Sequence, residues 1–242
     1  MPTVAELTAP YGNFMLAPQP GPGVCDTCFD LINQDQTRCR RCAAECGWLD
    51  ASAPISYSVA HEQLHHALRA YKRLPQRVAR RFQLELAAVL WRFLDEHEAC
   101  LAEAAGVGCF DLVTAVPSGH PERERHHPLT RMLAALIAPT RGRHEVLLTR
   151  SHTDAPPRAF SPTKFSPARQ LHGQAVLLVD DTWTTGASVR SAAASLKGGG
   201  AGAVAALVIG RHLHRDWAQN DQRLSRLARP FDWQRCALDA RR

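Results

Sequence analysis

Residues 175–188 read Ala-Val-Leu-Leu-Val-Asp-Asp-Thr-Trp-Thr-Thr-Gly-Ala-Ser, and this stretch decides the fold. Its apolar run, residues 176–179, is typical of a strand that is buried on both faces of a parallel sheet. Two carboxylates, Asp180 and Asp181, follow directly, and a helical pattern begins at Ala187. We therefore predict a strand–loop–helix unit with its polar residues at the carboxyl end of the strand, where open α/β sheets bind ligands.

The loop after the two acids carries groups that bind an anion. Free N–H groups open the following helix, and the helix dipole adds partial positive charge. Gly186 lets the backbone approach an anion, while Thr184, Thr185 and Ser188 offer hydroxyl donors. The acids would accept hydrogen bonds from vicinal hydroxyls. The loop therefore fits a sugar phosphate; the alternative is a capped turn in which the acids satisfy local N–H groups.

This stretch resembles the signature of the type I phosphoribosyltransferases, which has four apolar residues, two acids and a Thr-Thr-Gly loop. The resemblance implies that Asp180 and Asp181 contact the ribose hydroxyls of phosphoribosyl pyrophosphate (PRPP). It implies that the 5-phosphate lies against Thr182, Trp183, Thr184, Thr185, Gly186, Ala187 and Ser188. Trp183 stands where members carry a smaller residue, and it either lines the pocket, stacks on a base or packs, with packing the favoured interpretation.

The composition is that of an ordinary globular chain. Its 242 residues, 45% of them hydrophobic, suffice for one substantial domain and a small appendage. No apolar run reaches the length of a membrane span, and the first residues lack the regions of a signal peptide, so we expect a cytoplasmic protein. The net charge of +6 suits an anionic substrate or nucleic acid and proves neither.

The N-terminal part predicts a metal site. Residues 1–23 are rich in Pro and Gly, and we expect them to be flexible. Two Cys-x2-Cys pairs follow: Cys25, Cys28, Cys39 and Cys42. Two such knuckles give the tetrahedral four-thiolate shell that Zn²⁺ prefers, and in a reducing cytosol this explanation is stronger than disulfides. We therefore predict a structural zinc module over residues 24–50, with Cys46 as an alternative to Cys42; free thiols are the competing interpretation.

The middle of the chain predicts two helices, over residues 61–72 and from Pro75 to about residue 104, because apolar residues recur there at helical spacing. Basic side chains lie across both helices: Lys72, Arg73, Arg77, Arg80 and Arg81. We interpret them as a solvated face, with a groove for an anionic partner as the alternative.

A second strand is predicted over residues 111–116, and it also ends in a polar loop, which contains Ser118, Gly119 and Arg123. If the two strands are neighbours in a parallel sheet, this loop lies beside the first one. Its basic residues would then hold a second anion such as pyrophosphate. An exposed basic turn is an equally weighted alternative. A helix over about residues 128–138 would close the unit.

The remaining pattern continues the alternation of strands and helices. We predict strands at 145–148 and 203–209 and a helix at 189–197 that stops at three glycines. The alternation of strands and helices predicts a parallel sheet covered by helices on both faces, and residues 51–242 are assigned to this α/β domain.

The Pro-rich stretch 150–173 is interpreted as a mobile active-site cover, with Lys164 or Arg169 reaching the pyrophosphate. No pattern in the tail, residues 211–242, indicates where it packs.

The order of these parts resembles the ComF (GntX-like) proteins, which are bacterial phosphoribosyltransferase-fold proteins linked to competence for DNA uptake. The resemblance covers residues 25 to about 211 and rests on the four cysteines and on residues 175–188. The chain departs from the family after the Val-Pro loop, where members read Arg-Gly-Phe-Asn-Gln and this chain has His-His-Pro-Leu-Thr at 126–130. The family pattern before the signature is also largely lost in residues 150–173.

Two functions are therefore expected to compete. The first is transfer of the phosphoribosyl group from PRPP to an unknown acceptor, with Mg²⁺ neutralising the leaving pyrophosphate. The second is a binding module, either a non-catalytic PRPP or nucleotide sensor or an adaptor for single-stranded DNA that uses the zinc knuckles and basic helices. The sequence specifies neither the acceptor nor the oligomeric state.

Overall fold

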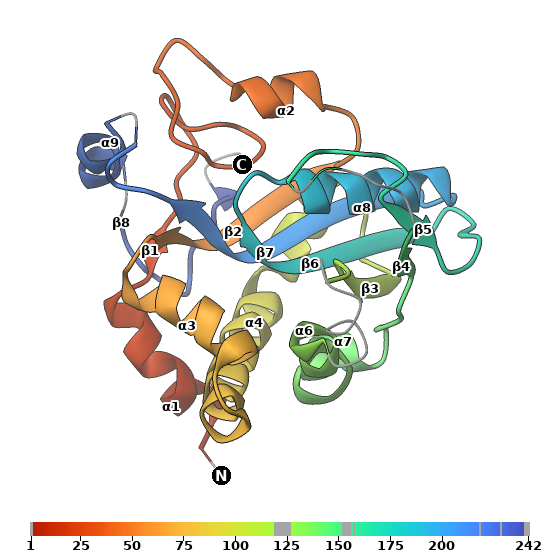
Figure 1. Cartoon of the computed structure of the whole chain (residues 1–242), viewed down its shortest axis with the longest axis horizontal. Helices are drawn as coiled ribbons and strands as arrows, with labels where there is room; N and C mark the ends of the chain where they lie inside the picture. The colour runs from red at the N-terminus through yellow and green to blue at the C-terminus, as the bar shows by residue number, and fades with distance from the viewer. Residues whose placement is uncertain are drawn as a thin grey trace.

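The computed structural model describes residues 2–118, 127–151, 156, 158–217, 219–227 and 229–239. Within these residues, six strands form one mixed, mainly parallel sheet in the order β3-β6-β7-β2-β1-β8 (Figure 1). Their bounds are Leu112–Ala115 (β3), Ala175–Trp183 (β6), Ala203–Leu213 (β7), Ala51–Val59 (β2), Leu16–Ala17 (β1) and Arg229–Pro230 (β8). The protein therefore has the predicted α/β fold.

The signature strand β6 lies between two parallel partners. It pairs with β3 as far as Ala115–Val179 and with β7 as far as Trp183–Arg211. The strand thus continues four residues beyond its predicted end at Val179, because β7 supplies backbone partners to that point. Strands 111–116 and 203–209 were predicted correctly in kind, and β7 is longer than expected.

Helices cover both faces of the sheet. On one face lie α3 (Gln63–Arg73) and α4 (Gln76–Ala104), which correspond to the two predicted helices. The other face carries α8 (Ala187–Gly198), next to the antiparallel pair β4 (Leu148–Arg150) and β5 (Phe165–Pro167). The predicted strand at 145–148 therefore begins later, and it belongs to a separate two-stranded sheet.

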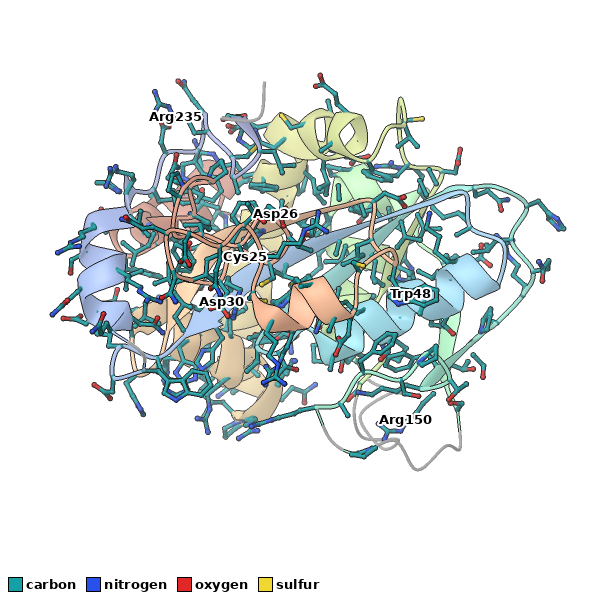
Figure 2. The ribbon with its side chains drawn as sticks, turned by 90° about the horizontal axis from the view of Figure 1, so that it is seen from above. Cys25, Asp26, Asp30, Trp48, Arg150 and Arg235 are labelled. Atoms are coloured by element: carbon teal, nitrogen blue, oxygen red, sulfur yellow. The ribbon has the colours of Figure 1, made fainter. Side chains whose placement is uncertain are left out.

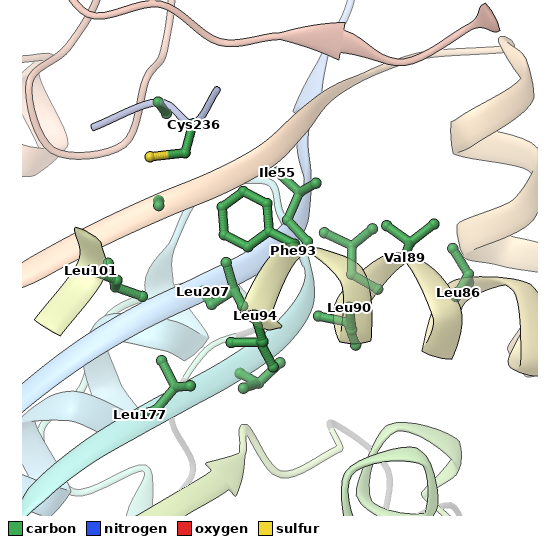
Figure 3. Close-up of a cluster of buried hydrophobic side chains, with 14 of the residues drawn as sticks. Ile55, Leu86, Val89, Leu90, Phe93, Leu94, Leu101, Leu177, Leu207 and Cys236 are labelled. Atoms are coloured by element: carbon green, nitrogen blue, oxygen red, sulfur yellow. The ribbon is translucent and has the colours of Figure 1, made fainter. Parts of the chain in front are cut away.

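The short helix α2 (Arg40–Ala44) lies beside α8, and the loops of residues 24–39 lie over the sheet next to it (Figure 2). On the opposite face, Leu86, Val89, Leu90 and Phe93 of α4 pack against Leu177 of β6 and Leu207 of β7 (Figure 3). The four-cysteine segment and the long helix α4 thus lie on opposite sides of the sheet.

Strand β2 was not predicted from the sequence. Serines at 52, 56 and 58 interrupt its apolar residues, and Pro54 argues against a strand. All nine residues are nevertheless buried, because β2 lies in the interior of the sheet between β7 and β1. Ser56 offsets the cost of its burial by exchanging hydrogen bonds with the backbone of Leu16 in β1.

The first residues are packed, whereas their composition led us to expect a flexible segment. Helix α1 (Val4–Thr8) begins with a capping box between Thr3 and Glu6 and packs on α4. A 3₁₀-helix, η1 (Ala9–Asn13), follows and buries Tyr11. The apolar surface of α4 provides the contacts that order this segment.

The last described residues return to α4. Helix α9 (Asn220–Leu227) leads to β8, and Phe231 and Trp233 then pack against the main core.

The predicted helix 128–138 consists of three short parts: α6 (Pro128–Arg131), the π-helical η2 (Met132–Leu136) and α7 (Ala138–Arg141). None of the helices in the described ranges combines the length and apolar character needed to cross a bilayer.

Candidate anion site and four-cysteine module

The turn between β6 and α8 requires glycine at position 186. Gly186 has a φ of 75°, and a Cβ there would lie 2.5 Å from the Trp183 ring and 2.6 Å from Nη1 of Arg190. Trp183 itself is 2% exposed and packs under the turn, in agreement with the favoured interpretation of this residue. The turn can therefore form only because Gly186 has no side chain, which leaves room for the Trp183 ring and the guanidinium of Arg190.

A small pocket lies at this turn. Its volume is about 150 Å³, and the residues that line it are Arg158, Asp180, Thr182, Thr184, Thr185, Gly186, Ala187, Ser188 and Val189. Pockets for whole ligands usually measure about 300–1,000 Å³. The pocket therefore has the size of a subsite for one anionic group, and it contains most of the residues predicted to hold the 5-phosphate.

Positive charge and N–H donors converge on this pocket. The amides of Ser188 and Val189 open α8 and have no acceptor within the helix. The ammonium of Lys164 lies 3.1 Å from Oγ of Ser188, and burial lowers the pKa of this lysine. Arg169, the other candidate for an anion contact, instead forms an ion pair with Glu145 at 2.6 Å.

The two acids of the signature point to opposite faces of the sheet. Side chains alternate along a strand, and β6 still has strand geometry at both positions. Asp180 points toward α8 and lines the pocket. Asp181 points toward α3, where its Oδ1 accepts a hydrogen bond from Nζ of Lys72 at 2.7 Å. Only Asp180 is thus at the pocket surface, and Asp181 is 5% exposed.

Their surroundings shift the two pKa values in opposite directions. Burial and the neighbouring charge of Asp181 raise the pKa of Asp180 well above its usual value. Burial acts in the same direction on Asp181, but the Lys72 ammonium and hydrogen bonds outweigh it and lower the pKa of that carboxyl. Asp181 is therefore the ionised member of the pair, and Asp180 is the one that retains a proton more readily.

The loop after β3 is described only in part. Val116 donates a backbone hydrogen bond to Val179 at 2.9 Å, so the end of β3 lies beside the end of β6, as predicted for neighbouring parallel strands. Ser118 follows at this edge, whereas Gly119 and Arg123 lie outside the described residues. His127 is buried near Lys72, and burial together with that ammonium lowers the pKa of the imidazole to about 4. His127 is therefore neutral at pH 7.

The four predicted cysteines form one cluster. The sulfur atoms of Cys25, Cys28, Cys39 and Cys42 all lie within 4.8 Å of one another. The sulfurs of Cys28 and Cys39 are 3.7 Å apart, and a tetrahedron with Zn–S bonds of 2.3 Å has edges of about 3.8 Å. The donor set and spacing therefore fit a structural metal such as zinc. Cys46 is exposed and is not part of the cluster, so the structure favours Cys42 as the fourth ligand.

Two buried arginines connect this module to the turn between β6 and α8, residues 184–186, which is the candidate anion loop. No sequence pattern points to either arginine. Arg190 of α8 lies 2.6 Å from Glu45, contacts the sulfur of Cys42 at 3.8 Å and donates to the carbonyl of Thr185 at 2.9 Å. The module is thus fixed to the loop that carries Thr184 and Thr185 through charged hydrogen bonds.

Arg211 of β7 makes the second connection. It pairs with Asp30 at 2.8 Å and donates to the carbonyls of Trp183 and Thr184 at 3.0 and 3.1 Å. Asp30 lies on the module next to Cys25 (Figure 2). Both ends of the anion loop are therefore held by arginines whose partners belong to the four-cysteine segment.

A larger pocket of about 490 Å³ adjoins the anion pocket and shares three of its lining residues: Arg158, Thr184 and Thr185. Its remaining wall includes His212, His214 and the 70%-exposed ring of Trp217. The small pocket thus adjoins a space whose volume lies in the range of pockets for organic ligands.

Comparison with known proteins adds no assignment: no known protein family matches the chain, and no curated protein matches it.

Proposed function

We propose that the protein binds a ribose 5-phosphate, most naturally as PRPP, at the turn between β6 and α8. The observation that carries this proposal is the pocket that Asp180 shares with the opening turn of α8. In this arrangement a phosphoryl group accepts hydrogen bonds from the amides of Ser188 and Val189 and faces the ammonium of Lys164. Asp180 accepts hydrogen bonds from the ribose hydroxyls, and Asp181 holds Lys72 beneath the strand.

The proposed reaction is transfer of the phosphoribosyl group to an acceptor. The bond between the anomeric carbon and pyrophosphate breaks, and a bond from the acceptor to the same carbon forms. The protein contributes chiefly by holding the sugar phosphate in position. Mg²⁺ would neutralise the pyrophosphate, and Asp180 is the one carboxylate among the residues that line the anion pocket. The adjoining pocket with Trp217 is the proposed place of the acceptor.

This proposal includes membership in the ComF proteins and a role in competence and DNA uptake. Its support is the sequence signature together with the four-cysteine cluster beside the signature loop. A non-catalytic PRPP sensor is the alternative that the same geometry supports, because a pocket for the sugar phosphate does not by itself provide a base for the acceptor.

Calorimetry tests the proposal directly. PRPP is titrated into the protein with and without Mg²⁺, and pyrophosphate release is measured in parallel. We expect PRPP to bind, and Asp180→Asn to weaken binding about 10-fold, since this change replaces a carboxyl oxygen that accepts from the ribose hydroxyls with an amide NH₂ that cannot accept, and an unpaired polar group at such a contact costs about 1–3 kcal/mol. Asp35→Asn is the matched control, because Asp35 is an exposed acid outside the pocket.

The outcomes separate the candidate functions. PRPP binding with pyrophosphate release supports an enzyme, and binding without release supports a sensor. Absence of PRPP binding, together with binding of single-stranded DNA that weakens steeply with salt, would contradict the proposal and support the DNA adaptor.

A further inference from the structure

A second cluster of metal-ligand side chains lies where the C-terminal segment meets α4. It consists of His97, Cys100, Cys236 and Asp239, and one potential ligand atom of each lies within 4.8 Å of the others. His97 and Cys100 are three residues apart on α4, so they share one helix face. Cys236 and Asp239 have the same spacing, and the amide of Asp239 donates to the carbonyl of Cys236 at 3.2 Å. Figure 3 shows Cys236 beside the core residues of α4 and β2.

The imidazole of His97 is oriented as in many metal sites. Its Nε2 lies 2.6 Å from the carbonyl oxygen of Trp233. A carbonyl oxygen can only accept, so Nε2 carries the proton, and a neutral imidazole then has its lone pair on Nδ1. Nδ1 lies 3.9 Å from the sulfur of Cys100 and thus faces the cluster. Metal-bound histidines commonly donate their second ring N–H to such a carbonyl, which fixes the ring.

The separations within the cluster fit tetrahedral coordination. Bonds of about 2.3 Å to sulfur and about 2.1 Å to nitrogen or oxygen place neighbouring sulfur and nitrogen or oxygen ligands about 3.6 Å apart. The distance from Nδ1 of His97 to Sγ of Cys100 is 3.9 Å, and that from Sγ of Cys236 to Oδ1 of Asp239 is 3.3 Å. Shifts of a few tenths of an ångström would complete the shell.

The carboxylate and the two thiols of the cluster would also be stabilised by a bound cation. His97 and Cys236 are buried, while Cys100 and Asp239 are half-buried. The carboxylate of Asp239 accepts from the amide and the thiol of Cys236, and no lysine or arginine in the described ranges pairs with it. A half-buried carboxylate beside two thiols gains a strong partner from a divalent ion.

We propose that His97, Cys100, Cys236 and Asp239 bind a second Zn²⁺ ion. Two sulfurs, one imidazole and one carboxylate are a donor set that zinc accepts, and four protein ligands leave no open position, so the ion has a structural role. Two ligands come from α4 and two from the C-terminal segment. The ion therefore fastens residues 231–239, including Trp233, to the long helix. This site is separate from the four-cysteine module, which lies on the other side of the sheet.

Metal content tests this proposal on the full chain. We expect two Zn²⁺ per wild-type chain after saturation with Zn²⁺ and removal of loosely bound metal, and one in Cys100→Ser. Asp239→Asn should lower the affinity of one site about 10- to 100-fold. Cys109→Ser is the matched control, since Cys109 is exposed and belongs to neither cluster. Cys25→Ser should also retain one ion, which isolates the second site.

Cobalt gives a spectroscopic readout of the second site by itself. The background variant carries Cys25→Ser and Cys28→Ser, which removes two of the four thiolates of the module. Co²⁺ added to it should produce the thiolate charge-transfer absorption of a two-sulfur site, and this absorption should fall by about half or more when Cys100→Ser is added. Limited proteolysis should cut residues 229–239 faster once the second ion is chelated. The proposal is overturned if the wild-type chain never binds more than one Zn²⁺ ion and the Cys100→Ser variant still binds that ion.

Discussion

The ammonium of Lys72 lies 2.7 Å from Oδ1 of Asp181, and this ion pair gives the two adjacent acids of the signature strand different environments. Asp181 faces α3, where the Lys72 ammonium balances its negative charge, while Asp180 faces the pocket beside α8. Lys72 belongs to the basic cluster that the sequence indicates as a solvated face, and it is exposed there as predicted. Its ammonium, at the last turn of α3, nevertheless reaches the carboxylate of Asp181 near the end of β6.

Breaking this pair is expected to destabilise the fold. Lys72→Gln leaves a buried carboxylate without its cation, and fully buried pairs lose about 3–5 kcal/mol in such experiments. Lys72 is 30% exposed, so solvent screening reduces the expected loss to about 2 kcal/mol. Urea unfolding measures it, with exposed Arg73→Gln as the control. A loss below 0.5 kcal/mol, on the order of ordinary surface substitutions, would contradict this view of the pair.

The same pair predicts the direction of a pH dependence. The folded-state pKa of Asp181 is lowered, so the pair stabilises the protein above the unfolded-state pKa of about 4. This contribution is lost as pH falls from there through the folded-state pKa. The stability difference between wild type and Lys72→Gln should therefore shrink below about pH 4. An unchanged difference at pH 3 would show that Asp181 is not the group involved.

Asp180→Asn should stabilise the unliganded protein at pH 7 even as it weakens ligand binding. The folded-state pKa of Asp180 is raised. At a pH above the unfolded-state pKa, folding must therefore either bury the carboxylate charge or take up a proton. The resulting loss of folding free energy grows with pH up to the folded-state pKa. Asparagine removes the cost. We expect a gain on the order of 1 kcal/mol, or about 2–4 °C in Tm. Calorimetric melting at pH 7 and pH 4 measures it, and the gain should be smaller at pH 4.

Gly186→Ala should distort the anion loop. The new Cβ would overlap the Trp183 ring, and the positive φ adds backbone strain, at a combined cost of about 1–3 kcal/mol. PRPP binding should be lost together with stability. Gly198→Ala is the matched control, because no atom lies within 4 Å of its new Cβ and alanine favours a helix. If both variants melt and bind alike, the turn does not need glycine.

Arg190→Met should affect the anion loop and the four-cysteine module together. It removes the partner of Glu45 and the donor to Thr185 in one step. We expect a loss of about 2–3 kcal/mol in stability and about 10-fold in PRPP affinity, although Arg190 does not line the anion pocket. Arg40→Met on α2 serves as the control, since Arg40 is exposed. Normal PRPP affinity in Arg190→Met would show that the loop keeps its shape without this link.

Cys28→Ser should release the metal of the four-cysteine module. Zinc analysis should show one ion fewer than in wild type, and amide exchange should rise in residues 24–46 while the sheet stays protected. Cys46→Ser should retain the wild-type zinc content, since Cys46 lies outside the cluster. Loss of zinc in Cys46→Ser but not in Cys42→Ser would reverse the assignment of the fourth ligand.

The parts of this protein that the sequence determined are those that depend on neighbours in the chain. The apolar run before Asp180, the glycine at 186 and the two Cys-x2-Cys pairs each specify their local geometry, because strand, turn and knuckle need only a few adjacent residues. From them followed the β6–α8 unit, the mainly parallel sheet and the cysteine cluster. Strand β2 was not predicted because its serines and its proline are untypical of a buried strand. Its burial depends on the neighbouring strands β7 and β1.

The tertiary structure decided which distant residues meet. Lys72 and Asp181 are 109 positions apart, Arg190 and Cys42 are 148 apart, and His97 lies 139 positions before Cys236. No local pattern encodes these contacts, since each depends on how helices and strands stack across the sheet. The sequence thus determined the shape of the anion loop and the cysteine knuckles. Packing determined which acid faces the pocket, what holds the loop, and where a second set of metal ligands assembles, because buried charges and thiols are stabilised only by the partners that folding brings to them.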